Sequence, residues 1–220
     1  MTRWDEVWDH RNAVSDYSLH YYNFMKNFAK KLEKGAKVLE AGCGSGDTLS
    51  SFKDQETYGL DMSKNALQLA KKNCNHAVLG NIMKIPFKDN TFDLVYNSGV
   101  LEHFKEPYNL KAAKEMVRVT KKGSYVIIIL PNRYCFWYRA YKILTTKLTG
   151  KCEFGYEEEY SHRRLKDLAR RAGLQIIKSF GLEVLPPLAT NRFQLLPVKL
   201  RKPLIHLDKL FPFKPYYAFG

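Results

Sequence analysis

The fold is decided by the stretch Lys37-Val38-Leu39-Glu40-Ala41-Gly42-Cys43-Gly44-Ser45-Gly46-Asp47-Thr48. Its first half is short and apolar, which is typical of a buried strand, and its second half has glycine at alternate positions. Glycine accepts positive φ angles, and its missing Cβ atom lets a ligand approach the backbone. In an open α/β sheet, ligands bind beyond the carboxyl ends of the strands. We therefore expect Glu40 and the glycines to lie in a ligand site.

The residues around this stretch limit the kind of ligand. The dinucleotide fingerprint requires glycine where this chain has Asp47, and no Lys-Ser/Thr pair follows the glycines as it does in a phosphate-binding P-loop. A second expected strand, residues 57–60, ends in Asp61, whose carboxylate can accept hydrogen bonds from both hydroxyls of a ribose. A nucleoside ligand without a pyrophosphate group is therefore expected.

These residues resemble the class I S-adenosylmethionine-dependent methyltransferases, in the branch that has L-E-A-G-C-G-x-G followed by L-E-H, and the resemblance spans residues 34–181. It implies S-adenosyl-L-methionine as the cofactor. The strand-one acid and glycine loop would hold its methionine part, the strand-two acid its ribose, and a polar residue after strand three its adenine. Many relatives have Asp where this chain has Asn81, whose side-chain oxygen can still accept a bond from the adenine amino group. The implied cofactor-binding residues are Glu40, Gly42, Cys43, Gly44, Gly46, Asp61, Met62, Asn81, Ile82, Met83, Asn97 and Ser98.

A second motif, Leu101-Glu102-His103, follows the expected fourth strand. The resemblance implies that it closes over the methionine end of the cofactor. His103 then has either a structural role or that of a catalytic base, which is needed only if the acceptor must lose a proton. His20 and His162 are the other candidates for a base. The residues expected near the substrate or in a lid are Tyr21, Tyr22 and Trp137.

The chain lacks the motifs of nucleic-acid base methylation. In the family, enzymes acting on adenine N6 or cytosine N4 have a pro-pro-aromatic sequence after strand four, and enzymes acting on cytosine C5 need a Pro-Cys nucleophile. Here that position holds Tyr96-Asn97-Ser98-Gly99. We therefore expect methyl transfer to a small-molecule or lipid-like acceptor, with an RNA methyltransferase or a non-catalytic cofactor-binding protein as the alternatives.

The order of apolar runs predicts an α/β protein with a doubly wound, Rossmann-like, mostly parallel seven-stranded sheet and helices on both faces. Ser161 and Gly173 are expected to begin and end a basic helix. Strands are expected at residues 36–41, 56–61, 76–80, 92–97, 124–130 and 174–179, and an N-terminal helix at 14–31. The expected domains are an N-terminal helical cap or lid, 1–33, an S-adenosylmethionine-binding methyltransferase domain, 34–181, with an insertion at 132–160, and a basic, aromatic C-terminal extension, 182–220.

Positive charge is concentrated in the second half of the chain. Residues 1–110 have 14 basic and 14 acidic side chains, so the whole formal net charge of +14 lies in residues 111–220. An anionic partner is expected. Residues 134–148 and the C-terminal extension combine aromatic with basic side chains, which favours peripheral contact with an anionic membrane, with nucleic acid as the alternative. The basic helix at 162–171 is either a phosphate-binding surface or a solvated face.

Location and redox state follow from simpler features. No apolar run approaches the ~20 residues that span a bilayer, and the first residues lack the apolar core of a signal peptide. A cytoplasmic location is expected, with any membrane contact at the periphery. The cysteines at positions 43, 74, 135 and 152 have neither C-x-x-C spacing nor a histidine cluster, so we expect reduced thiols and no metal site.

Overall fold

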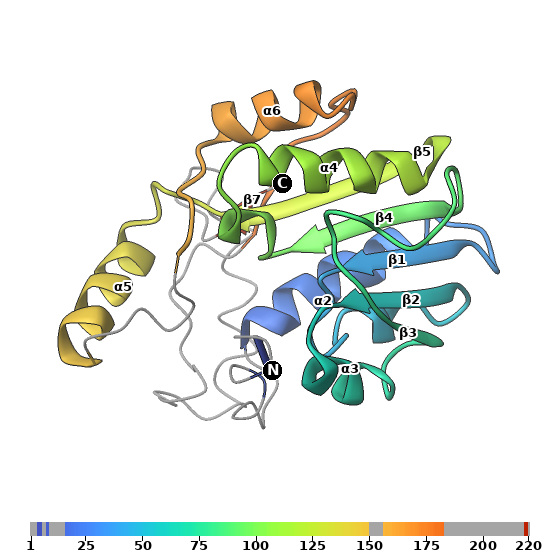
Figure 1. The fold of residues 1–220 in the computed structure, drawn as a ribbon, viewed down its shortest axis with the longest axis horizontal. Helices are drawn as coiled ribbons and strands as arrows, with labels where there is room; N and C mark the ends of the chain where they lie inside the picture. The colour runs from blue at the N-terminus through green and yellow to red at the C-terminus, as the bar shows by residue number, and fades with distance from the viewer. Residues whose placement is uncertain (1–3, 6–7, 9–15, 150–155, 183–217, 220) are drawn as a thin grey trace.

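The computed structural model describes residues 4–5, 8, 16–149, 156–182 and 218–219. Within these residues the chain forms an α/β sheet covered by helices (Figure 1). The strands pair in the order β3-β2-β1-β4-β5-β7-β6. Their bounds are β1 Lys37–Ala41, β2 Glu56–Asp61, β3 His76–Leu79, β4 Phe92–Ser98, β5 Thr120–Pro131, β6 Gly181–Leu182 and β7 Ala218–Phe219.

Five parallel strands form the body of the sheet. β1 lies at its centre, where Leu39 pairs with Tyr58 of β2 on one side and with Val95 of β4 on the other. The chain first builds outward from β1 through β2 to β3, and then returns to the other side of β1 for β4 and β5. The doubly wound parallel sheet is therefore confirmed. The strand order reverses between β1 and β4, which is the point where such sheets bind ligands.

The sequence predicted a mostly parallel sheet of seven strands, and this is wrong, because the parallel part has only five. β7 and β6 are two residues long and pair antiparallel beyond β5. The strand expected at residues 174–179 is not formed, and β6 begins only at Gly181. Beside β5, Leu130 and Pro131 pair with β7 instead. The segment 174–179 therefore does not gain the strand partner that its backbone would need to join the sheet.

Helices cover both faces of the sheet (Figure 1). Successive residues of a strand point to opposite faces. On β4, Val95 belongs to the same buried cluster as Met116, whereas Tyr96 belongs to the cluster that contains Met25. Burial on both faces explains why the strand sequences are continuously apolar. One face has α2 Asp16–Ala29 and α3 Lys64–Ala70, and the other has α4 Tyr108–Val119 and α6 His162–Arg171; α2 lies within the expected N-terminal helix.

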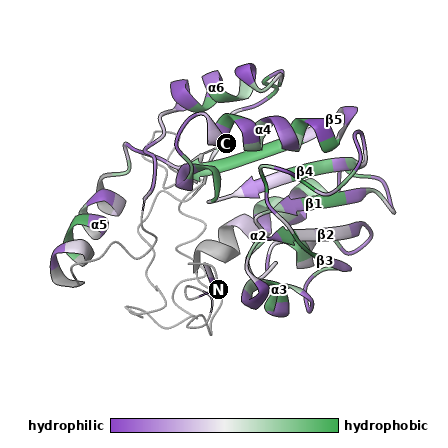
Figure 2. Ribbon diagram, viewed as in Figure 1, coloured by the Kyte–Doolittle hydropathy of each residue, from purple (hydrophilic) through white to green (hydrophobic). Residues whose placement is uncertain are grey.

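The basic helix has the ends that the sequence predicted. The Ser161 side chain accepts a hydrogen bond from the backbone N–H of Arg164, which caps α6, and Gly173 follows with a φ of +95°. Leu165 and Leu168 are buried against the sheet. Figure 2 shows the contrast between hydrophobic β5 and the hydrophilic residues of α6.

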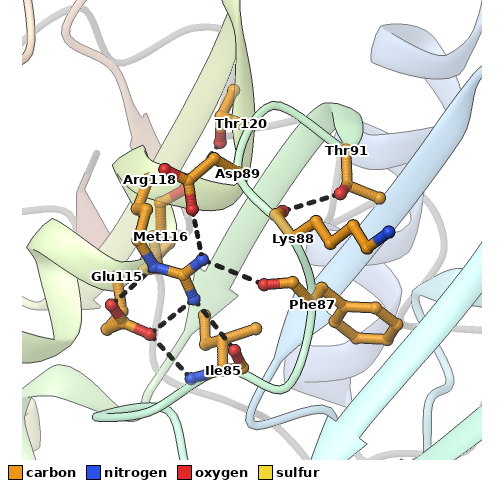
Figure 3. Close-up of polar contacts among 9 residues, drawn as sticks. All are labelled: Ile85, Phe87, Lys88, Asp89, Thr91, Glu115, Met116, Arg118 and Thr120. Atoms are coloured by element: carbon orange, nitrogen blue, oxygen red, sulfur yellow. Dashed lines mark hydrogen bonds and ion pairs between the residues drawn. The ribbon is translucent and has the colours of Figure 1, made fainter.

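Arg118 anchors the connection between β3 and β4 to α4 (Figure 3). Its guanidinium donates to the carbonyl oxygens of Ile85 and Phe87, each at 2.9 Å. It also donates to the carboxylates of Asp89 and Glu115, at 2.7 and 2.8 Å. These two carboxylates raise the pKa of Arg118 above its usual value. A single side chain thus fixes the path of a loop that has no regular structure of its own.

The insertion forms α5, Phe136–Thr149, which begins beyond the carboxyl end of β5 and projects from the sheet (Figure 1). Its Tyr138 is buried, and the hydroxyl lies 2.9 Å from Glu157 Oε2. Ile143 and Leu144 are 56% and 58% exposed. The Trp137 side chain lies outside the described residues, as do residues 183–217, which make up most of the expected C-terminal extension. No helix in the described ranges is long and apolar enough to cross a membrane.

Candidate functional site

The loop after β1 adopts the turn that its glycines predicted. Gly42, Gly44 and Gly46 have φ angles of +83°, +52° and +70°. The N–H groups of Gly42 and Cys43 both donate to the Leu60 carbonyl, at 2.7 and 2.9 Å, so the turn bends over β2. A Cβ atom on Gly42 would lie 2.5 Å from Val100 Cγ2. Glycine is therefore required at this position for space as well as for backbone conformation.

Asp61 is joined to this loop at the carboxyl end of β2. Its Oδ2 accepts the N–H of Gly44 at 2.9 Å, and its Oδ1 accepts the N–H of Ser63 at 2.8 Å. Burial raises the pKa of Asp61, and the two backbone bonds act against that rise. Each carboxylate oxygen still has a second lone pair for a ligand. The structure thus brings together the loop and the acid that the sequence assigned to one ligand.

Glu40 is buried beneath the same loop. The Thr48 hydroxyl lies 2.9 Å from both of its carboxyl oxygens, and the Tyr96 hydroxyl lies 3.0 Å from Oε2. Burial raises the pKa of Glu40 to about 8, and these two hydrogen bonds only partly oppose the effect. The carboxyl group is therefore predominantly protonated at neutral pH. Its contacts link β1 and β4 beneath the glycine turn.

The hydrogen bonds of Asn97 indicate whether the site suits a ligand with an amino acid group. Its Nδ2 donates to the Ala41 carbonyl at 2.9 Å, which holds the amide between β4 and β1. Its buried Oδ1 has no hydrogen-bond partner within the described part of the chain. A buried acceptor without a partner destabilises the protein by about 1–3 kcal/mol. The ammonium group of S-adenosylmethionine is a suitable donor, so the site fits the cofactor that the resemblance implies.

The remaining predicted cofactor residues lie along the neighbouring strand ends. Asn81 is exposed after β3, and its side-chain oxygen accepts the N–H of Met83 at 2.8 Å. Ile82 is buried, whereas Met62 is 40% exposed. Burial raises the pKa of Cys43, so its sulfur is a packed thiol. Ser98 is half-buried at the end of β4, and Met83 packs against the core of the α4 face.

His103 lies in the short 3₁₀ helix η2, Leu101–His103, after β4. Its Nδ1 is 2.9 Å from the Tyr156 carbonyl oxygen. A carbonyl can only accept, so Nδ1 must carry the hydrogen, and in the neutral ring Nε2 then has the lone pair. This tautomer is the one in which Nε2 can take a proton. The neighbouring Glu102 is fully buried, and burial raises its pKa well above the usual value.

The other predicted residues lie on α2 and α6. Tyr21 packs against the core of the α2 face, and Tyr22 is half-buried on the same helix. His162 is the first residue of α6. The side chain of His20 lies outside the described residues.

Three residues that the sequence prediction missed are at the site. A Cβ atom on Gly44 would lie 2.3 Å from Trp8 Cζ2, so the Trp8 indole packs directly on the loop. The Asp5 carboxylate accepts a bond from the Ser63 hydroxyl at 2.7 Å. The Trp4 ring is 4.8 Å from the His103 ring. The sequence signal for Trp4 and Trp8 is their spacing of four residues, which would place two side chains on one face if a segment is helical.

Within the described residues, no three His, Cys, Asp or Glu side chains are grouped to hold a metal ion. Cys43, Cys74 and Cys135 are free thiols.

Comparisons with known proteins agree with this geometry. The family described as Methyltransferase domain matches residues 39–128. A demethylmenaquinone methyltransferase of a Geobacillus species is 32% identical over 174 residues, covering 69% of this chain and 72% of that protein. An uncharacterized protein of Methanocaldococcus jannaschii is 39% identical over 109 residues, and the chain spans only 46% of its length. In fold, a methyltransferase structure from Thermotoga maritima matches with a TM-score of 0.64 and 24% identity, covering 87% of this chain and 84% of that one.

Proposed function

This chain belongs to the S-adenosylmethionine-dependent methyltransferases, and from that premise we propose that it methylates a small, apolar acceptor of the demethylmenaquinone kind. The observation that carries the proposal is the length of the alignment with demethylmenaquinone methyltransferase. It covers 69% of this chain, whereas the family match covers only residues 39–128. The similarity therefore extends beyond the part that defines the family, which supports an acceptor of the same kind.

The residues of the site have the chemistry that this reaction needs. The cofactor supplies a methyl group that is already activated on a sulfonium. We propose that Asp61 binds the ribose hydroxyls, that Asn97 accepts a bond from the ammonium group, and that the glycine loop contacts the methionine part. Holding the acceptor in line supplies much of the rate. In the tautomer set by the Tyr156 carbonyl, His103 Nε2 is the base for an acceptor that must lose a proton.

α5 supports an apolar or membrane-associated acceptor. It begins at the carboxyl end of β5, on the same edge of the sheet as the site. Its exposed Ile143 and Leu144 are accompanied by the exposed basic residues Arg139 and Lys147. Aromatic or aliphatic side chains next to basic ones are typical of helices that bind an anionic lipid surface. Within this proposal, residues 1–33 act as a cap, 34–181 as the catalytic domain and 182–220 as a basic extension.

The direct test is methyl transfer by the purified protein. Demethylmenaquinone, chemically reduced to its quinol so that the ring carbon is nucleophilic, is presented in vesicles containing anionic lipid, with S-adenosylmethionine labelled on its methyl group, and label in the lipid fraction is measured. Asp61→Ala should reduce cofactor affinity at least tenfold, because each charge-assisted bond contributes about 1.5–3 kcal/mol. The exposed Asp54, at the opposite edge of the sheet, provides the matched Asp54→Ala control.

The acceptor proposal fails if label stays out of the quinone while added RNA becomes methylated. RNA binding would also weaken steeply with salt, because it depends on phosphate contacts. A loss of activity in Asp61→Ala without any loss of cofactor affinity would instead contradict the assignment of Asp61 to the ribose.

A further inference from the structure

The 156–160 segment, which precedes α6 in the chain, is fastened to η2 by two hydrogen bonds. The Tyr156 carbonyl accepts from His103 Nδ1 at 2.9 Å, and the N–H of Glu158 donates to a backbone carbonyl of η2 at 2.6 Å. We propose that Glu158 and Arg164 are positioning residues for His103, because they hold the Tyr156 carbonyl against its ring. This inference rests on the proposed role of His103 as the base.

The side chain of Tyr156 is held as well as its carbonyl. Its hydroxyl donates to Glu158 Oε2, and Lys105 Nζ lies 4.8 Å from the centroid of its ring. Tyr156 and Glu158 are two residues apart, the spacing at which side chains of an extended chain lie on the same side. The bond from the Tyr156 hydroxyl lowers the pKa of Glu158. The Glu158 carboxylate is therefore ionised at neutral pH, and its other oxygen can accept a bond from a cation.

Arg164 on α6 is that cation. Its Nη1 donates to Glu158 Oε1 at 2.5 Å, and its guanidinium lies 5.1 Å from the centroid of the Tyr160 ring. The side chains of Glu158 and Arg164 are 19% and 40% exposed, so the pair is partly shielded from water. The backbone of Arg164 is fixed by its bond to the Ser161 cap. A packed helix thus sets the place of the Glu158 carboxylate, which in turn sets the place of Tyr156.

Glu157 fastens the same segment to α5. Its Oε2 lies 2.9 Å from the Tyr138 hydroxyl and 2.7 Å from Lys142 Nζ. Both partners belong to α5, so the segment is held between α5 and η2. These contacts do not involve the pair of Glu158 and Arg164. Substitution of either member should therefore change how Tyr156 meets η2 while the segment stays attached to α5.

The effect of the pair is to favour one tautomer of His103. A neutral imidazole has one ring hydrogen, and the bond made by one nitrogen determines the state of the other. The Trp4 ring, 4.8 Å away, restrains the tilt of the imidazole, but an indole N–H only donates and cannot favour a hydrogen on Nδ1. A misplaced Tyr156 carbonyl lets the hydrogen move to Nε2, which then cannot take a proton from the acceptor. A residue that only stabilised the fold would leave the tautomer unchanged.

Nuclear magnetic resonance of the full chain with isotopically labelled histidine tests the pair. The nitrogen shifts report which ring nitrogen has the hydrogen, and His103→Gln identifies the signals of this ring. Spectra are recorded up to the pH at which the shifts stop changing, so that the neutral ring is observed. In the natural protein, Nδ1 should have the hydrogen. Arg164→Met and Glu158→Gln should each lower the ratio of the Nδ1–H to the Nε2–H tautomer about fivefold, as expected for one hydrogen bond. Arg164→Lys should recover part of the loss, because it keeps the charge.

Methyl transfer to reduced demethylmenaquinone is measured with the same variants. The kcat should fall by up to fivefold, because it follows the fraction of rings in which Nε2 is free. Affinity for S-adenosylhomocysteine should stay within twofold, since the pair contacts none of the proposed cofactor residues. The matched controls are Glu159→Gln, an exposed carboxylate in the same segment, and Arg163→Met, an exposed arginine on the same helix. Both controls should keep the natural tautomer and the natural rate.

The two measurements separate this inference from the proposed function. An unchanged tautomer in both Glu158→Gln and Arg164→Met would overturn the inference, because the ring would then be held without the pair. A changed tautomer with an unchanged rate would support the pair as positioning residues and show that His103 is not the base. That second result contradicts the proposed function alone.

Discussion

The polar groups around Arg118 are all paired, whereas some of those in the proposed cofactor site are not paired within the described residues. All five N–H donors of the Arg118 guanidinium have an acceptor (Figure 3). At the site, Asn97 Oδ1 and Glu102 Oε2 are buried and have no partner among the residues described. Burial also raises the pKa of Glu40 and of Asp61 there.

The difference separates a region that stabilises the fold from the region proposed to bind the cofactor. A saturated network stabilises the fold, and nothing remains in it for a ligand to bind. Unpartnered acceptors and buried acids cost free energy in the folded chain, and they are retained where a ligand can supply the missing donors and charge. Four substitutions test this contrast, and those with the larger expected consequences come first.

Gly44→Val should abolish measurable cofactor binding. A Cβ atom at this position meets Trp8 Cζ2 at 2.3 Å, and overpacking of this kind costs about 1–3 kcal/mol of folding free energy. The branched side chain would also stand where the ligand passes the loop, which is why binding should be lost. Gly123→Val is the matched control, because Gly123 also has a positive φ, +78°, but has no atom within 4 Å of an added Cβ. Titration of both variants with S-adenosylhomocysteine measures the difference in binding. Similar binding by both variants would show that the loop is not at the ligand.

Glu40→Gln should change how stability depends on pH. The pKa of Glu40 rises from 4.5 to about 8 on folding, so folding takes up a proton between these values. This contribution is complete below pH 4.5 and is lost as the pH rises to 8. The variant has no such proton, so its stability relative to the natural protein should rise by about 3–4 kcal/mol between pH 5 and 8.

Urea denaturation at several pH values measures this effect. The exposed Glu33 provides the control, and Glu33→Gln should follow the natural protein. A constant difference between Glu40→Gln and the natural protein across the range would mean that Glu40 is ionised in the folded state.

Arg118→Met should lower the free energy of unfolding by about 2 kcal/mol, because it leaves two backbone carbonyls and two carboxylates without their donor. Partial solvent exposure of Arg118, at 31% of its side chain, keeps the loss below that of a fully buried network. Cofactor affinity should stay within twofold. Lys121→Met removes a more exposed ion pair with Asp93 and should cost under about 1 kcal/mol. A large drop in affinity for Arg118→Met would couple the anchor to the site.

Asn97→Ala should have the smallest effect on stability, under about 1 kcal/mol. The lost bond to the Ala41 carbonyl is offset because an unpartnered buried acceptor is removed as well. Affinity for S-adenosylhomocysteine should nevertheless fall, since the product keeps the ammonium group. Denaturation and titration of the same preparation check both parts. Unchanged affinity would show that Asn97 Oδ1 does not face the ligand.

The amino-acid sequence alone was enough to predict the centre of the fold and to propose the outline of the site. Apolar runs and their spacing predicted the five parallel strands, because burial on both faces leaves a continuous apolar signal. The three glycines and Asp61 could be assigned together, since parallel strand ends meet at one edge of the sheet. Ser161 and Gly173 marked the ends of α6, because capping is chemistry within a few residues.

The contacts between distant segments around the site could be seen only in the folded chain. Asp5 meets Ser63 across 58 residues of chain, and His103 meets the Tyr156 carbonyl across 53. The edge of β5 pairs with β7 and not with the segment 174–179. No local pattern specifies such partners, because each depends on how separate elements pack and on which backbone groups remain unpaired once they have done so. The sequence could therefore predict a cofactor loop, whereas packing determined which residues surround it.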